Sequence, residues 1–163
     1  MKSKIKIGLV GASGRMGQEI TNILRGNSHF ELYLAICRQS SLAEFAYTRE
    51  TVQCPEAKEV SVWIDFSDPA LLTKLLLVAT KNRTPVVSGT TGLSPASALA
   101  LKKAAQKIPI LWASNMSLGV AVLTEALEVF GRLKQFDFQI EEFHHNQKKD
   151  KPSGTAKSLQ QRL

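Results

Sequence analysis

The sequence predicts an α/β fold with a doubly wound parallel sheet, followed by the start of a second α+β domain. Over the first two-thirds of the 163 residues, strand-like and helix-like segments alternate. Such alternation is typical of an α/β layer architecture with a largely parallel sheet. A different, period-two pattern follows near the end of the chain. We therefore expect one domain over residues 1–115 and part of another over residues 116–163.

Each expected element follows from its local pattern. Residues 4–10 form a β-branched strand that ends in glycine, and residues 15–25 repeat apolar side chains at helical spacing. Residues 30–36 give the second strand, residues 38–59 a weakly patterned loop with a short helix, and residues 60–65 the third strand. Pro69 suits the first turn of a helix that runs through Ala79. Strands over residues 85–88 and 110–113 then enclose a helix over residues 95–107.

The pattern changes in the last third of the chain. A helix is expected over residues 119–133. Residues 136–143 alternate apolar and polar side chains, and this predicts a half-exposed strand of a different sheet.

Composition and charge narrow the class of protein. The 21 basic and 14 acidic residues give a net charge of +7, but the basic residues are scattered and show no stripe typical of nucleic-acid binding. A positive field also suits anionic small molecules such as nucleotide phosphates and dicarboxylates, and we favour that interpretation. No apolar run is long enough to span a membrane and no signal peptide is recognisable, so we expect a cytoplasmic protein. Cys37 and Cys54 lack metal-ligand spacing and are expected to be buried, reduced thiols.

The turn between the first strand and the first helix is rich in glycine and reads Gly11, Ala12, Ser13, Gly14, Arg15, Met16 and Gly17. Small residues let the backbone approach a pyrophosphate, and the helix N-terminus offers N–H donors and a positive dipole end. A tight turn also needs glycine for structural reasons alone. The position after a strand and before a helix nevertheless favours dinucleotide binding in a Rossmann-like domain.

The residue that contacts the adenosine ribose is expected about 20 positions after the turn. Cys37 stands there, so the acid that would select a 2′-hydroxyl is missing, and Arg38 follows. An arginine can pair with the 2′-phosphate of NADPH, and a solvated loop charge is the alternative for Arg38. The pattern favours NADPH over NADH.

Ligands of open α/β sheets lie beyond the carboxyl ends of the strands. Three such ends carry small or hydroxyl-bearing residues: Asp65–Ser67, Gly89–Gly92 and Ala113–Ser117. Each alone is typical of a turn, but together they predict contacts to the nicotinamide end of a cofactor.

A histidine- and lysine-rich segment follows the period-two segment. It contains His144 and His145, then Lys148, and finally Ser153 as the expected N-cap of a helix. Histidine is the usual proton donor near neutral pH, and Lys148 adds a fixed cation. A solvated surface loop is the alternative. A zinc site is not expected, because no third ligand stands at suitable spacing.

Five strings of this chain occur in the order seen in the 4-hydroxy-tetrahydrodipicolinate reductase (dihydrodipicolinate reductase) family, which the chain therefore resembles. They are residues 11–17, Asp65–Ser67, Gly89–Gly92, Ser114–Ser117 with Gly119 and Val120, and His144-His145-x-x-Lys148-x-Asp150-x-Pro152-Ser153-Gly154-Thr155-Ala156.

The resemblance implies an oxidoreductase that transfers hydride from NADPH or NADH to a cyclic imine dicarboxylate in lysine and diaminopimelate biosynthesis. By the family pattern, His144 and Lys148 match the proton donor and its partner, and His145, Gly154 and Thr155 match substrate-binding positions. The matched cofactor-binding positions are Gly11, Ala12, Ser13, Gly14, Arg15, Met16, Arg38, Gly89, Thr90, Thr91, Ala113, Ser114, Asn115 and Met116. The implied domains are a dinucleotide-binding domain (1–115) and a partial substrate-binding and oligomerisation domain (116–163). The full-length family is expected to form a homotetramer.

Two departures from the family pattern matter. Many members have an acid where Cys37 stands, and the family normally continues well beyond Thr155, so we expect the second domain to be truncated. The alternative function is a non-catalytic nucleotide-binding module or redox sensor. Short-chain dehydrogenases are excluded, because Tyr33 and Tyr47 lack a lysine four residues later.

Overall fold

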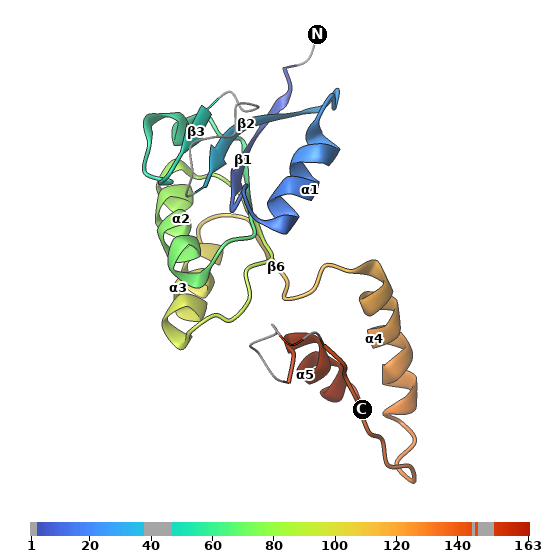
Figure 1. The fold of residues 1–163 in the computed structure, drawn as a ribbon. Helices are drawn as coiled ribbons and strands as arrows, with labels where there is room; N and C mark the ends of the chain where they lie inside the picture. Colours follow the sequence, from blue (N-terminus) through green and yellow to red (C-terminus); the bar gives the residue numbers. More distant parts are fainter. Residues whose placement is uncertain (1–2, 38–46, 145, 147–151) are drawn as a thin grey trace. The chain divides into compact units, whose positions relative to one another are not determined.

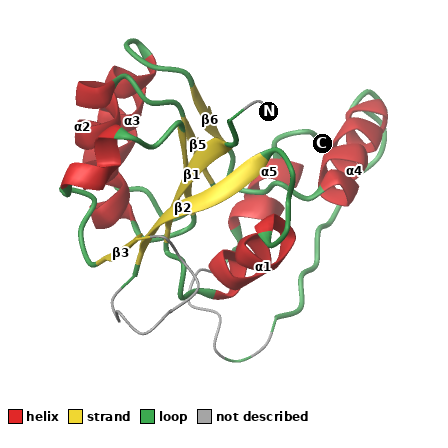
Figure 2. Cartoon of the chain, turned by 90° about the horizontal axis from the view of Figure 1, so that it is seen from above, coloured by secondary structure: helices red, strands yellow, loops and turns green. Residues whose placement is uncertain are grey.

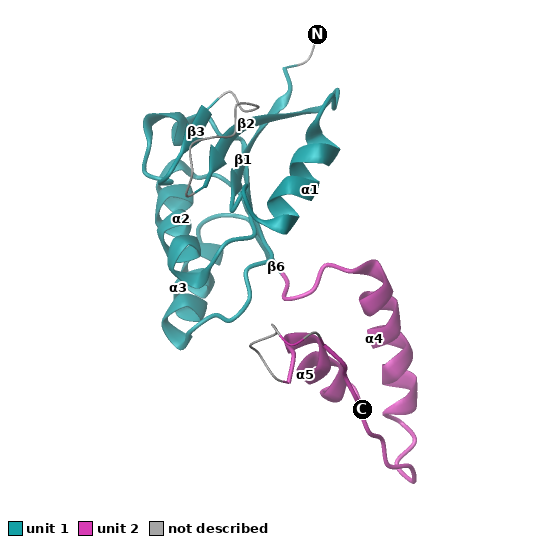
Figure 3. Ribbon diagram, in the orientation of Figure 1, with its two compact units in different colours: residues 1–112 teal, residues 113–163 magenta. Residues whose placement is uncertain are grey.

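The computed structural model describes residues 3–37, 47–144, 146 and 152–163. The chain divides into two compact units, Met1–Trp112 and Ala113–Leu163 (Figure 3). The division falls three residues before the boundary expected after Asn115. Each unit has its own secondary structure.

The first unit contains a six-stranded, wholly parallel sheet (Figure 1). Its strand order, β3-β2-β1-β4-β5-β6, changes direction at β1, so the doubly wound α/β fold predicted from the sequence is confirmed. The strands are β1 (Ile5–Val10), β2 (Phe30–Ile36), β3 (Tyr47–Arg49), β4 (Val62–Asp65), β5 (Val86–Ser88) and β6 (Ile110–Trp112). The helices are α1 (Arg15–Leu24), the 3-10 helix η1 (Pro55–Lys58), α2 (Pro69–Asn82) and α3 (Pro95–Ala105).

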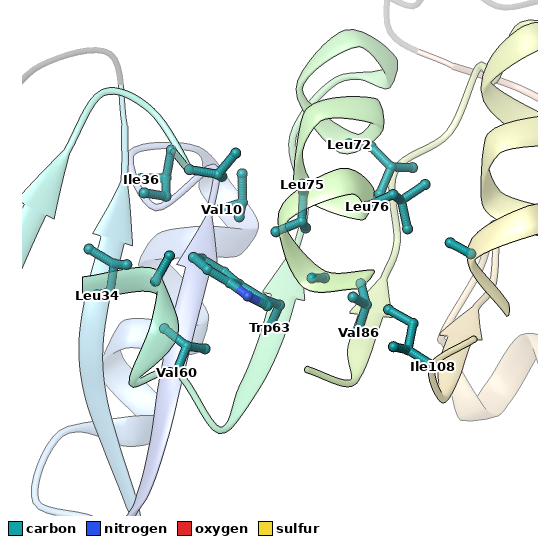
Figure 4. Close-up of a cluster of buried hydrophobic side chains, with 14 of the residues drawn as sticks. Val10, Leu34, Ile36, Val60, Trp63, Leu72, Leu75, Leu76, Val86 and Ile108 are labelled. Carbon is teal, nitrogen blue, oxygen red and sulfur yellow. The ribbon is translucent and has the colours of Figure 1, made fainter. Parts of the chain in front are cut away.

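Helices cover both faces of the sheet. Helices α2 and α3 lie on one face and α1 on the other (Figures 1 and 2). The larger apolar core lies on the α2 and α3 side, where Trp63 of β4 is fully buried among Leu72, Leu75 and Val86 (Figure 4). A smaller cluster, which includes Leu9 of β1, lies between the sheet and α1. The two clusters fix β1 and β4 at the centre of the sheet.

Proline and a capping side chain mark the start of two helices in this unit. Asp68 caps α2 by accepting hydrogen bonds from two backbone N–H groups, and Ser94 caps α3 in the same way with one. Pro69 and Pro95 follow these caps at the first turn, where a missing N–H costs nothing. The carboxyl ends of β4 and β5 thus lead into short loops and then directly into a rigid helix.

The second unit contains α4 (Leu118–Phe130) and α5 (Gly154–Gln160) (Figure 3). Ser153 caps α5 through a hydrogen bond from the Ala156 N–H, which confirms the predicted N-cap. The predicted strand over residues 136–143 is wrong, because that segment has no strand structure. A strand needs a hydrogen-bonding neighbour, and none is present in the part of this unit that the structure describes. Phe138 instead meets Phe130 of α4 edge to face, with 6.4 Å between ring centroids.

The weakly patterned segment over residues 38–59 contains more structure than expected. The short helix is confirmed as η1, but β3 was not predicted. Of the two cysteines, Cys37 is buried as expected and Cys54 is only half-buried. No helix among the described residues is long and apolar enough to cross a membrane.

Candidate functional site

The glycine turn brings three backbone segments into close contact. Gly11 has a positive φ of 82°, and a Cβ atom there would lie 2.4 Å from the carbonyl oxygen of Phe66. A Cβ atom on Gly17 would lie 2.3 Å from the carbonyl oxygen of Gly11. Both positions therefore exclude any side chain, and α1 begins directly against the ends of β1 and β4.

The N-terminus of α1 is suited to bind an anion. Gly14 occupies the N-cap and provides no side-chain hydrogen bond, and the first turn carries no acidic residue. The side chains of Ser13, Arg15 and Met16 are exposed. The first N–H groups of a helix have no intrahelical acceptor and lie at the positive end of the helix dipole. A phosphate group at this end would meet both donors and a favourable field.

Ala12 differs from its neighbours in this turn. Its side chain is buried, and its N–H group and that of Gly11 both donate to the carbonyl oxygen of Ile36, at 3.2 and 3.0 Å. Among the predicted cofactor residues, Ala12 therefore fixes the turn to the end of β2, and any contact it makes to a ligand is through backbone.

A pocket of about 280 Å³ lies beside the glycine turn. Its lining joins the turn to the ends of β2, β3 and β4 and consists of Gly11, Ser13, Gly14, Ile36, Cys37, Glu50, Phe66, Ser67, Asp68 and Leu71. The strand register aligns Ile36, Val10 and Asp65 across the sheet, so this pocket lies at the carboxyl edge. That is the edge where ligands of doubly wound sheets bind.

Glu50 is a pocket residue that was not predicted from the sequence. Glu50 follows β3, which pairs with β2, and this pairing brings its exposed side chain to the same pocket as Cys37. Phe66, which belongs to the predicted strand end Asp65–Ser67, also lines the pocket. The predicted Arg38 lies outside the described residues.

The loops after β4 and β5 are joined by a buried carboxylate. Asp65 is fully buried and accepts hydrogen bonds from the hydroxyls of Ser67, Ser88 and Thr90. The bonds from Ser88 and Thr90 are both 2.7 Å long. Burying a carboxylate is costly unless such donors compensate. The loop ends that the sequence singled out are therefore brought together by Asp65.

Thr90 links the two loops directly and connects them to β6. Its hydroxyl accepts a 3.0 Å bond from the Ser67 N–H, and its carbonyl oxygen accepts a 2.9 Å bond from the indole N–H of Trp112. The side chain of Thr90 is buried, whereas Thr91 is exposed and Gly89 is half-buried. Of these three predicted cofactor residues, Thr91 therefore has the most accessible side chain.

In the second unit, two loops that are distant in sequence meet. The side-chain amide of Asn115 donates a 2.9 Å hydrogen bond to the hydroxyl of Thr155, and its oxygen accepts a 2.8 Å bond from the Ser117 N–H. A predicted cofactor residue thus contacts a predicted substrate residue. Ala113, Ser114 and Met116 lie in the same loop as Asn115, and Gly154 begins α5 beside Thr155.

Glu142 connects the predicted proton donor to the start of α5. One carboxylate oxygen lies 3.0 Å from Nε2 of His144, and the other accepts a 2.7 Å bond from the Ser153 N–H. Hydrogen bonding by Ser153, and then by His144, lowers the pKa of Glu142 to about 2. The carboxylate is therefore ionised at neutral pH and holds His144 by Nε2. The predicted residues His145 and Lys148 lie outside the described residues. Within the part that is described, no three metal-ligating side chains gather.

Two family models match the chain, and the boundary between them lies close to the boundary between the two compact units. The family described as "Dihydrodipicolinate reductase, N-terminus" matches residues 5–116, and "Dihydrodipicolinate reductase, C-terminus" matches residues 119–163.

Curated relatives support the same grouping. The chain is 51% identical over 160 residues to a 4-hydroxy-tetrahydrodipicolinate reductase of Bdellovibrio bacteriovorus, and this match covers 98% of the chain and 66% of the relative. It is 39% identical to a protein of the same name from a Wolbachia of Brugia malayi, covering 94% of the chain and 62% of the relative. The chain thus spans slightly less than two thirds of the length of these relatives.

A solved structure shows the same fold. Dipicolinate-bound dihydrodipicolinate reductase from Paenisporosarcina sp. TG-14 matches 98% of the chain and 65% of its own length, with a TM-score of 0.75 and 22% identity.

Proposed function

The chain belongs to the dihydrodipicolinate reductase family, and we propose that it serves the NAD(P)H-dependent reduction of 4-hydroxy-tetrahydrodipicolinate to tetrahydrodipicolinate in lysine biosynthesis. The observation that supports this most strongly is the uncapped N-terminus of α1 beside the 280 Å³ pocket at the carboxyl edge of the sheet. In this proposal the first unit binds the dinucleotide, and the second unit is part of the substrate-binding and oligomerisation domain.

The residues of the first unit fit a dinucleotide. The N–H groups at the start of α1 would hold the pyrophosphate, and Gly11, Ser13 and Gly14 line the pocket beside them. Gly89, Thr90 and Thr91 would contact the nicotinamide end. In the second unit, Ala113, Ser114, Asn115 and Met116 are the residues proposed to bind cofactor. When bound, NAD(P)H supplies the hydride, and the protein provides orientation.

The choice between NADPH and NADH involves two opposing side chains. Arg38 can pair with a 2′-phosphate and favours NADPH, and we keep this as the expected preference. Glu50, which lines the same pocket as Cys37, has a carboxylate that can accept from a 2′-hydroxyl and repel a 2′-phosphate. We infer that Glu50 reduces the preference for NADPH and lets NADH bind as well.

Reduction also needs a proton at the carbon next to the one that accepts hydride. His144 would donate it, with Lys148 as its partner. Because Glu142 engages Nε2 of His144, Nδ1 is the ring nitrogen that would carry the proton toward substrate. His145, Gly154 and Thr155 would bind the substrate carboxylates, and Ser153 orders the start of α5 for this role.

The test combines nucleotide titration with steady-state turnover. For the 163-residue chain, which spans slightly less than two thirds of the length of its relatives, we expect saturable NADPH binding and much weaker turnover. Replacing His144 with glutamine should lower any substrate-dependent NADPH oxidation by about 100-fold or more, the range expected for losing a general acid, without changing the NADPH dissociation constant. The matched control is His29→Gln, which alters an exposed histidine of the first unit and should change neither quantity.

The outcomes separate the candidate functions. Absence of saturable NADPH binding would overturn the proposal. Binding without any substrate-dependent turnover would instead support the alternative of a non-catalytic nucleotide-binding module.

A further inference from the structure

We propose that Asp65 is a positioning residue for the nucleotide site, one that holds the loops after β4 and β5 in the conformation that accepts the dinucleotide. This inference rests on the proposed nucleotide binding. Asp65 ends β4 and is fully buried, and it does not line the pocket itself. It would therefore act only through the groups that it holds.

The direction of each hydrogen bond around Asp65 follows from the number of protons that its partners can donate. The hydroxyl of Thr90 accepts a bond from the Ser67 N–H, and the hydroxyl of Ser88 accepts one from the Thr90 N–H at 3.3 Å. Each hydroxyl has a single proton, and each directs it to Oδ2 of Asp65 at 2.7 Å. The carboxylate thus orients both hydroxyls so that they accept from the loop backbone.

Of the three residues whose hydroxyls donate to Asp65, Ser67 is the one that also lines the pocket. Its hydroxyl donates to Oδ1 of Asp65, its N–H donates to Thr90, and the residue itself lines the pocket beside the glycine turn. Between Asp65 and Ser67, the ring of Phe66 packs so closely on Gly89 that a Cβ atom there would lie 2.2 Å from Cε1. Fixing Asp65 and Ser67 therefore also fixes Phe66, a second wall of the pocket.

Replacing Asp65 with asparagine tests this role, because an amide keeps one acceptor oxygen and puts an NH₂ donor in place of the other. At least one of the three hydroxyls then loses its acceptor. The control is Thr73→Val, which removes a hydroxyl of α2 that donates to the Pro69 carbonyl oxygen and belongs neither to the Asp65 hydrogen bonds nor to the pocket lining. We measure the NADPH dissociation constant, the denaturant midpoint, and amide hydrogen exchange at Ser67 and Thr90 in the ligand-free chain.

The two variants are expected to differ in binding more than in stability. Asp65→Asn should raise the NADPH dissociation constant about tenfold and speed exchange at the Ser67 amide, since charge-assisted hydrogen bonds are the stronger ones. Thr73→Val should change the dissociation constant less than twofold and leave exchange at the Ser67 amide unchanged. Equal effects of the two variants on both binding and Ser67 exchange would overturn the positioning role and leave Asp65 as a purely structural residue.

Two further measurements cover the cases in which Asp65→Asn does not fold or the unchanged chain does not bind NADPH. If Asp65→Asn does not fold, Thr90→Ser should retain NADPH affinity because it keeps the hydroxyl, whereas Thr90→Val should lose it; equal affinity of these two variants contradicts the proposal. If the unchanged chain binds no NADPH, the proposed function fails. In that case, amide hydrogen exchange at Ser67 and Thr90 in the ligand-free variants still shows whether Asp65 or Thr90 orders the loops after β4 and β5.

Discussion

Gly11→Ala is expected to weaken both the fold and nucleotide binding, because two separate penalties meet at this position. The positive φ of 82° disfavours any residue with a Cβ atom, at about 1–2 kcal/mol. The new Cβ atom would lie 2.4 Å from the carbonyl oxygen of Phe66, well inside the 3.0 Å that real Cβ atoms respect. Forcing this backbone contact apart adds about 1–3 kcal/mol by analogy with overpacked cores, for about 2–5 kcal/mol in total.

Gly26→Ala is the matched control for this prediction. Gly26 also has a positive φ, of 71°, but a Cβ atom there would meet nothing within 4 Å. It should therefore cost only the conformational part, about 1–2 kcal/mol. The difference between the two variants isolates the close approach of the glycine turn to Phe66.

The assay is denaturant unfolding followed by the fluorescence of the two tryptophans, Trp63 and Trp112, together with NADPH titration of each folded variant. Because the clash displaces Phe66 and the turn at the pocket, Gly11→Ala should weaken NADPH binding by at least tenfold, whereas Gly26→Ala should leave it unchanged. Equal destabilisation by the two variants, or unaltered NADPH affinity in Gly11→Ala, would refute this explanation of the turn.

Two further predictions concern single side chains. Glu50→Gln should increase the affinity for NADPH relative to NADH, because it removes a negative charge from the pocket that would hold the adenosine ribose. The ratio of the two dissociation constants measures this effect. An unchanged ratio would place Glu50 away from the 2′-position of the ribose. The pKa of Glu142 is depressed from 4.5 to about 2, so its stabilisation of the second unit should be fully present above pH 4.5 and be lost as the pH falls toward 2. An NMR titration of the Ser153 amide should show a midpoint near pH 2, and a midpoint near 4.5 would contradict the hydrogen bonds that Glu142 accepts.

Elements with strong local signals were predictable from the sequence. The glycine turn, the Pro69 and Pro95 helix starts and the Ser153 cap depend on residues adjacent in the chain, and the structure has all of them. Strand β2 was predicted at its observed bounds, because a short, mostly apolar run is typical of a strand in a buried parallel sheet.

Features that depend on distant partners were not predictable. Strand β3 has only three residues, and pairing with β2 rather than its own pattern makes it a strand. Residues 136–143 show the opposite case, since a period-two pattern without a pairing neighbour did not produce a strand. Glu50 joins the candidate site only because β3 pairs with β2, which a linear motif does not reveal. Asp65 stood in a strand end that the sequence singled out, but its hydrogen bonds to Ser88 and Thr90 depend on the pairing of β4 with β5.

The most direct test of this account is an NMR titration of the isotope-labelled chain with NADPH. If the pyrophosphate binds at the N-terminus of α1, the amide signals of Ser13, Gly14 and Arg15 should shift most, with those of Ser67 and Thr91 following. Another pocket, of about 440 Å³, lies between η1 and α2 and includes Cys54 and Lys81. Shifts confined to that pocket, or no shifts at saturating NADPH, would contradict the central claim that the glycine turn forms the nucleotide site.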